Sequence, residues 1–200
     1  MIITDRDRLV INYIEKVKYA TTKNIAELFF NNGSKNYHIV ALKRLGQLVS
    51  YGKIKSVSAN IGKHGRPMTL YFIDGKLDKS NYKHALALAD LSANLVMNDI
   101  DILSIEHEVY LNKKIRVDAI YKVISNGKKR LFLVEFDITK KFNVTKYEYY
   151  NKSGEWKDSF KTFPRIVSIS DNKFEGSKII NIIKINSNLD NINLLLNDIR

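Results

Sequence analysis

The Asn126-Gly127 pair, set between two apolar runs, constrains the fold of this chain more than any other feature. Asn-Gly favours a two-residue type I′ turn, because both central residues of that turn must adopt positive φ. The flanking runs, 117–124 and 131–138, are rich in β-branched and aromatic residues and are typical of strands. The sequence therefore predicts a β-hairpin whose register is fixed by its turn.

This register brings acidic residues together. If Ser125 pairs with Lys128, then Asp118 falls opposite Glu135, with Cβ atoms roughly 5 Å apart. Asp137 shares the face of Glu135, because side chains alternate along a strand. Two carboxylates about 4 Å apart repel each other by on the order of 4 kcal/mol at an effective dielectric near 20. The pair therefore requires a cation, a lysine or a shared proton.

Two interpretations of the acidic face follow from the residues alone. Three carboxylates on one sheet face suit a hard divalent ion such as Mg²⁺, which takes oxygen ligands. The alternative is a solvated strand face whose acids pair with Lys122 and Lys146. The residues alone leave both open.

Charge points to a polyanionic partner. The net charge is +12, which predicts attraction to nucleic acid or to an anionic membrane surface. The excess is uneven, because residues 1–73 hold twelve Lys and Arg against four Asp and Glu. We therefore expect the electrostatic contact surface in the first part of the chain.

Composition also narrows the cellular setting. The chain has no cysteine, which removes disulfides and thiolate metal sites and fits a cytoplasmic protein. No apolar run approaches eighteen residues, so we expect no transmembrane helix and no membrane partner. The first ten residues lack a basic region followed by an apolar stretch, so we expect no signal peptide.

The first segment, residues 1–76, has the layout of a winged helix-turn-helix. Helical periodicity predicts three helices, and two strands follow them, joined by a basic, glycine-rich connection. In the third helix, 34–50, we expect Val40, Leu42, Leu45 and Leu48 to point inward.

Basic residues of this segment are the expected DNA contacts. Lys35, Lys43 and Arg44 would contact the groove or backbone from the third helix, and Lys63 and Arg66 would do so from the wing. The alternatives are an ordinary solvated basic face and a winged helix used for protein contacts.

The second segment, residues 77–200, predicts a helix at 82–98, three antiparallel strands, a helix at 142–151 and further strands at 165–170 and 178–186. A last helix starts near Leu189, with Asn188 as its cap. If the turn at 112–114 has three residues, Glu108 lies opposite Asp118 on the first strand.

This order, with Asp118 on the second strand and Glu135-x-Asp137 on the third, resembles the PD-(D/E)XK nuclease-like superfamily. With the winged helix included, the whole chain resembles the replication-relaxation family of plasmids, phages and integrative elements. The residues that carry the resemblance are Glu108, Arg116-Val117-Asp118-Ala119, Leu133-Val134-Glu135-Phe136-Asp137, Lys146-x-x-x-Tyr150, Trp156 and Phe163-Pro164-Arg165-Ile166-Val167.

The resemblance implies an α+β protein: an N-terminal winged helix-turn-helix followed by a PD-(D/E)XK-like α-β-β-β-α-β domain. In an active member, Asp118, Glu135 and Glu108 would be catalytic and would bind Mg²⁺, with Asp137 as a further ligand or as the group that orients the lysine. Two positions depart from the superfamily pattern. Val117 replaces its proline, and Asp137 stands where its lysine belongs; Lys146 is the candidate to supply an ammonium instead.

Three functions follow from these expectations. The first is a DNA-binding protein of a mobile genetic element, acting in replication, DNA relaxation or transcriptional control, with an inactive nuclease-like domain. The second is a Mg²⁺-dependent DNA endonuclease, or nickase, targeted by its winged helix. The third is a protein-interaction adaptor. Double-stranded DNA is the expected partner, and a homodimer is expected by analogy with proteins that read paired half-sites.

Overall fold

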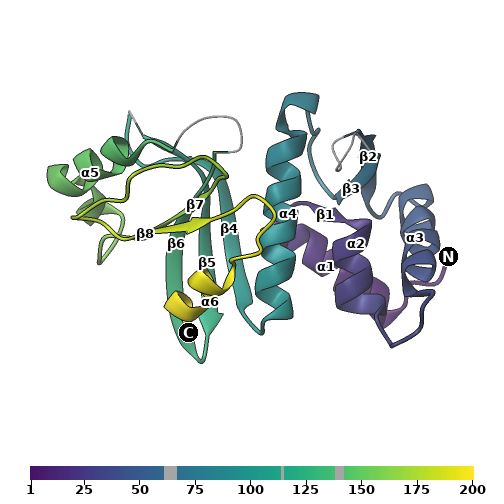
Figure 1. The fold of residues 1–200 in the computed structure, drawn as a ribbon. Coiled ribbons are helices and arrows are strands. Elements are labelled where there is room, and N and C mark those ends of the chain that lie inside the picture. The colour runs from purple at the N-terminus through teal and green to yellow at the C-terminus, as the bar shows by residue number, and fades with distance from the viewer. Residues whose placement is uncertain (61–66, 114, 138–141) are drawn as a thin grey trace. The chain divides into compact units, whose positions relative to one another are not determined.

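The computed structural model describes residues 1–60, 67–113, 115–137 and 142–200 (Figure 1). The chain forms two compact units, Met1–Met97 and Asn98–Arg200. Both mix helices with a sheet, so the chain is a mixed α/β protein with a helical N-terminal region. None of the helices that the structure describes has the length and apolar character needed to cross a membrane.

The first unit contains the three expected helices and the two expected strands. Its three-stranded sheet is antiparallel and has the order β1-β3-β2. The elements, in chain order, are α1 (Asp5–Val17), β1 (Ala20–Thr21), α2 (Thr22–Ile25), the π-helical turn η1 (Ala26–Phe30), α3 (Tyr37–Ser50), β2 (Lys55–Ala59), β3 (Met68–Phe72), the 3-10 turn η3 (Lys79–Asn81) and α4 (Tyr82–Met97).

Local side-chain chemistry sets where the first helix begins. The Thr4 hydroxyl accepts the Asp7 N–H at 3.3 Å, and the Asp7 carboxylate accepts the Thr4 N–H at 2.7 Å. This capping box satisfies two amides that the first helical turn leaves without a partner. Thr4 is therefore the N-cap of α1.

The buried face of α3 differs from the expected one. Leu45 and Leu48 are buried as predicted, together with Ala41. Val40 is 51% exposed and Leu42 is 52% exposed, so their inward assignment is wrong. The buried stripe follows the spacing 41, 45, 48, and Val40 and Leu42 lie on either side of it. The exposed face of α3 is therefore more apolar than expected.

Helix α4 belongs to the first unit, whereas the sequence assigned residues from 77 onward to the second domain. Its Ala85 and Ala89 pack against Leu70 of β3. Asn24 of α2 donates its side-chain amide to Asp90 Oδ1 at 3.0 Å. The small side chains of these alanines allow α4 to pack closely within the first unit.

The second unit is built on a five-stranded mixed sheet with the order β4-β5-β6-β7-β8 (Figure 1). The first three strands are antiparallel, and β6, β7 and β8 run parallel. Its elements are β4 (Asp101–Tyr110), β5 (Arg116–Ser125), β6 (Lys128–Phe136), α5 (Val144–Ser153), the 3-10 turn η4 (Glu155–Asp158), β7 (Arg165–Ile169), β8 (Ile182–Ile185) and α6 (Asn193–Ile199).

The last helix begins later than expected. Helix α6 starts at Asn193, and no side chain caps it. The Asn188 amide instead contacts Asp190 Oδ2 at 2.5 Å, so the prediction of Asn188 as the cap is wrong. Leu189 has a φ of 62°, which is incompatible with an α-helical start at that residue.

Both hairpin registers match the sequence expectation. β5 and β6 pair from Ser125 with Lys128 outward to Ala119 with Val134. Asn126 and Gly127 have φ of 49° and 72°, as a type I′ turn requires. In the other hairpin, Leu111 N–H donates to Ile115 O at 2.8 Å, which is the register predicted for a three-residue turn.

Candidate carboxylate–lysine site and basic helix face

Asp118 lies one residue beyond the last paired position of the β5–β6 hairpin. Its Oδ2 accepts the backbone N–H of Phe136 at 2.7 Å, so the side chain bridges to the neighbouring strand. This contact holds the carboxylate beside Glu135, the residue that the register places opposite it. The two carboxylates also interact electrostatically, because the negative charge of Asp118 raises the pKa of Glu135.

Glu135 is buried, and two residues of α5 hold its carboxylate. Lys146 Nζ lies 2.5 Å from Glu135 Oε1, and the Tyr147 hydroxyl donates to the same oxygen. Helix α5 begins at this place because Asn143 caps it, accepting the Lys146 N–H at 3.1 Å. The cap therefore positions the first helical turn, which carries both partners of Glu135.

The Lys146 ammonium also donates to the backbone oxygen of Arg116 at 2.6 Å. It therefore links β5, β6 and α5 at one point. A lysine was one of the three agents that the facing carboxylates required, and the structure supplies it. Lys122, the other lysine considered for that role, pairs with Glu106 at 2.7 Å.

Burial and charge perturb the titration of this cluster. Burial raises the pKa of Glu135 to about 7; Lys146 lowers that pKa, and the Asp118 charge raises it. Burial also raises the pKa of Tyr147 well above its ordinary value, and the charges of Glu135, Asp118 and Asp137 raise it further. All three predicted carboxylates thus act on the Tyr147 phenol.

Glu108 takes a different position from the one that a metal ligand needs. It has a φ of 50°, and its exposed carboxylate pairs with Arg116 at 3.4 Å. The register places it next to Asp118, as predicted, but its printed partner is this arginine. Glu108 therefore contributes to a surface ion pair, which contributes little to stability.

Within residues 1–60, 67–113, 115–137 and 142–200, no three His, Asp or Glu residues are placed to hold a metal ion. One carboxylate oxygen of Glu135, Oε1, accepts hydrogen bonds from both Lys146 and Tyr147. A divalent ion at this oxygen would compete with the ammonium.

Tyr147 is the site residue that the sequence did not single out. The motif drew attention to Lys146 and Tyr150, which are one helical turn apart. Tyr150 is fully buried and lies near Phe163, with ring centroids 6.1 Å apart. The sequence did contain a signal for Tyr147. Tyr147 and Tyr150 are three residues apart on α5 and share one face of the helix, so both face the sheet when Tyr150 is buried.

The predicted DNA contacts of the first unit divide into two groups. Lys35, in the turn before α3, and Lys43 are exposed. Arg44 instead contacts both carboxylate oxygens of Asp7, at 2.8 and 2.5 Å, and Gln47 at 2.8 Å. Arg44 therefore connects α3 to the start of α1. Lys63 and Arg66 lie outside the described residues.

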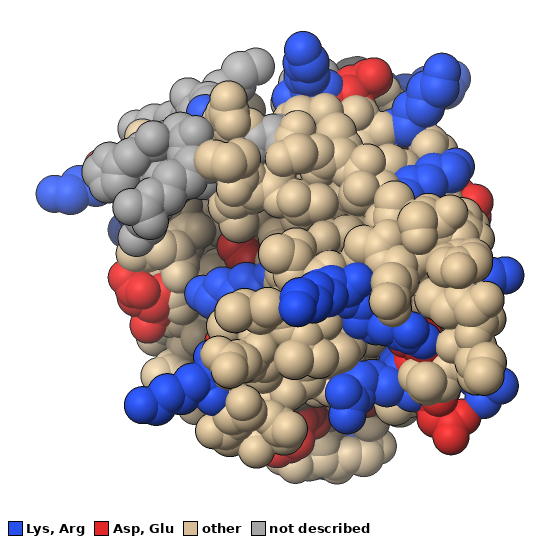
Figure 2. Space-filling model, turned by 90° about the vertical axis from the view of Figure 1, so that its right-hand side faces the viewer, with Lys and Arg blue, Asp and Glu red and all other residues tan. Residues whose placement is uncertain are grey.

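Figure 2 views the side of the molecule on which α3 lies. Lys and Arg side chains project over much of this face, between areas of uncharged surface. The uncharged surface of α3 includes the half-exposed Ile39, Val40 and Leu42. This face therefore combines basic side chains and a few acidic ones with exposed apolar residues of α3.

Comparison with protein-family models, with curated proteins and with solved structures finds no match. Functional inference therefore rests on the geometry and chemistry of this chain.

Proposed function

We propose that this chain is a DNA-binding protein of a mobile genetic element, acting in replication, DNA relaxation or transcriptional control. The first unit would be a winged helix-turn-helix that reads double-stranded DNA, and the second a PD-(D/E)XK-like platform. The observation that carries the proposal is the exposed face of α3 together with the turn before it, where Lys43 and Lys35 accompany exposed apolar side chains.

The arrangement of the first unit supports a winged helix. Its order is helix, strand, two helices and a two-stranded hairpin, and β1 completes the sheet beside β3. In such a layout the third helix enters the major groove, and the hairpin contacts the backbone. The third helix here, α3, carries the exposed Lys43 and the exposed apolar residues, and Lys35 lies in the turn before it.

The chemistry of α3 suits a DNA groove. Lysines bind phosphates or guanine edges, and apolar side chains contact the methyl group of thymine. Ile39 and Leu42, at 53% and 52% exposure, are available for such contacts. A protein-interaction surface would use the same apolar residues, but it would gain from the positive charge only with an acidic partner, whereas DNA is always anionic.

Replacing Lys35 and Lys43 together with alanine is expected to weaken binding to duplex DNA. Each lost phosphate contact lowers the slope of log K against log salt by about 0.9, so the slope should fall by about 1.8. At about 0.1 M salt this corresponds to roughly 60-fold weaker binding. Fluorescence anisotropy of a labelled duplex, titrated at several salt concentrations, measures both quantities.

The matched control is Lys76→Ala with Lys83→Ala, which removes two exposed lysines of the first unit that lie outside α3. This variant should bind almost as tightly as the wild type. If both double variants weakened DNA binding equally, the binding would reflect general attraction by net charge and not a specific contact surface at α3. If the affinity of the wild type for duplex DNA did not change with salt concentration, this result would favour the adaptor function.

A Mg²⁺-dependent endonuclease is the second candidate, and the position of Lys146 favours it. Its ammonium lies beside Glu135, at the place where the superfamily's missing lysine would be needed. Lys146 contacts only the Oε1 oxygen of Glu135, so the second oxygen of this carboxylate could still be a metal ligand.

If the second unit cleaves DNA, the full chain should nick supercoiled plasmid in the presence of Mg²⁺ or Mn²⁺. Asp118→Asn should then abolish nicking, since it removes one carboxylate while keeping the side-chain shape. Gel electrophoresis of the plasmid measures the conversion. No nicking by the wild type with either ion would support the platform role.

A further inference from the structure

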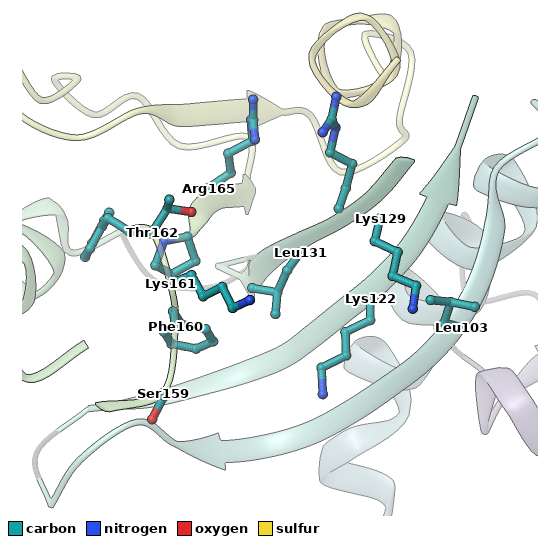
Figure 3. Close-up of a pocket in the computed structure, with 12 residues that line it drawn as sticks. Leu103, Lys122, Lys129, Leu131, Ser159, Phe160, Lys161, Thr162 and Arg165 are labelled. Carbon is teal, nitrogen blue, oxygen red and sulfur yellow. The ribbon is translucent and has the colours of Figure 1, made fainter. Parts of the chain in front are cut away.

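The second unit contains a pocket of about 530 Å³ near the hairpin end of its sheet (Figure 3). This volume lies within the range of small-molecule sites. Strands β4, β5 and β6 form one side, and the segment before β7 forms the other. The residues that matter for its chemistry are Leu103, Lys122, Lys129, Leu131, Phe160 and Lys161.

The hairpin register determines which side chains face the pocket. Lys122 and Leu131 are directly paired, so they lie on the same face of the sheet. Lys129 and Glu135 share this face with Leu131, because side chains alternate along β6. The pocket is therefore on the sheet face of the carboxylate–lysine site. Leu131 and Glu135 are four residue steps apart along β6, a distance of about 13 Å.

The pocket is lined by more Lys and Arg side chains than there are carboxylates paired with them in the described part of the chain. Lys122 pairs with Glu106, and Arg165 at the edge pairs with Asp198. Lys129 and Lys161 are exposed and have no carboxylate partner among the residues that the structure describes. Two uncompensated ammonium groups beside one cavity attract an anionic ligand.

The surface between these lysines is apolar. Leu131 and Phe160 pack against the core of the second unit and remain partly exposed, and Leu103 is 41% exposed. Figure 3 shows Lys161 extending toward Leu131, with Phe160 beside it and Lys122 and Lys129 across the pocket. An inorganic anion alone would leave this apolar surface exposed to water. A ligand that joins an anionic group to a flat aromatic group covers both.

We propose that this pocket binds a nucleotide, either free or as one unit of a single strand. Lys161 and Lys129 attract its phosphate from the two sides of the pocket, and the base stacks on Phe160 over Leu131. Single-strand sites combine these two elements, a basic groove and an aromatic platform. The inference concerns the second unit alone and does not depend on duplex binding by α3.

The test uses the full chain with Lys35→Ala and Lys43→Ala, so that the first unit contributes little to binding. Anisotropy of a labelled oligo-dT of about ten nucleotides reports the affinity. Adding Lys129→Ala and Lys161→Ala should lower the salt slope by about 1.4 and weaken binding about 25-fold at about 0.1 M salt. Adding Phe160→Leu, which keeps an apolar side chain, should weaken it at least about fivefold.

The matched control is Lys152→Ala with Lys178→Ala, two exposed lysines of the second unit away from the pocket. This control should bind the oligonucleotide almost as tightly as the parent chain. The proposal would be overturned if the control lost as much affinity as the Lys129→Ala, Lys161→Ala variant. It would also be overturned if that pocket variant kept its full affinity. A competition experiment distinguishes a free nucleotide from a nucleotide within a single strand. If free nucleotides bind, thymidine monophosphate displaces the labelled oligonucleotide. If a strand is required, only unlabelled oligo-dT displaces it. Equal displacement by inorganic phosphate would contradict recognition of the base.

Discussion

Replacing Arg44 with alanine is expected to lower the free energy of unfolding of the first unit by about 3 kcal/mol at neutral pH. The Asp7 side chain is 2% exposed and accepts two hydrogen bonds from this guanidinium. The guanidinium holds the pKa of Asp7 well below its usual range. Without Arg44, a carboxylate would remain buried and ionised. Hydrogen exchange of amides in α1 and α3 measures the loss.

The pH dependence of this effect has a defined sign. A carboxyl with a lowered pKa stabilises the folded state above its unfolded pKa of about 3.9, and the contribution is lost as the pH falls through the folded value. The difference between wild type and Arg44→Ala should therefore shrink below about pH 4. Lys43→Ala, the adjacent exposed position, should leave stability unchanged within about 0.5 kcal/mol. A similar loss in that control would contradict a specific role for Arg44.

Replacing Glu135 with glutamine is expected to remove a pH dependence from the stability of the second unit. The folded pKa of Glu135 is about 7, above its ordinary value of 4.5, because the carboxyl is buried. The folded state therefore binds more protons than the unfolded state between these values, and its stability falls as the pH rises. Relative to Glu135→Gln, wild-type stability should fall by about 3 kcal/mol from pH 4.5 to 7.

Trp156 makes this measurement specific to the second unit. It is the only tryptophan of the chain, and its ring packs edge-on against Phe163 at 5.7 Å. Urea unfolding followed by its fluorescence, at several pH values, gives the two stability curves. Glu175→Gln, an exposed position, is the control and should run parallel to the wild type. A wild-type curve that also runs parallel to Glu135→Gln would show that folding leaves the pKa of Glu135 near its ordinary value, which would contradict the prediction.

Short-range chemistry explains the features that were predictable from the sequence. Asn126-Gly127 fixes the β5–β6 register through positive φ, and the register then places Asp118 next to Glu135. Thr4 starts α1 through a capping box contained within four residues. Features of this kind depend on neighbours in the chain, and a sequence pattern records them directly.

Features that depend on packing between distant segments were not predictable in the same way. Helical periodicity placed Leu42 inward, but its exposure depends on how α3 rotates against the rest of the first unit. The role of Arg44 depends on Asp7, which is 37 residues away, and no local pattern links the two. The reach of Lys146 to Glu135 depends on the orientation of α5, which buried aromatic residues such as Tyr147 determine.

Hydrogen exchange of the full chain with and without duplex DNA tests the central claim most directly. If the first unit reads DNA through α3, a duplex should slow the exchange of amides in Tyr37–Ser50 and in the preceding turn with Lys35. The Lys35→Ala, Lys43→Ala variant should lose this protection at the same DNA concentration. Protection confined to Asn98–Arg200, or unchanged exchange in α3 with DNA bound, would contradict the claim.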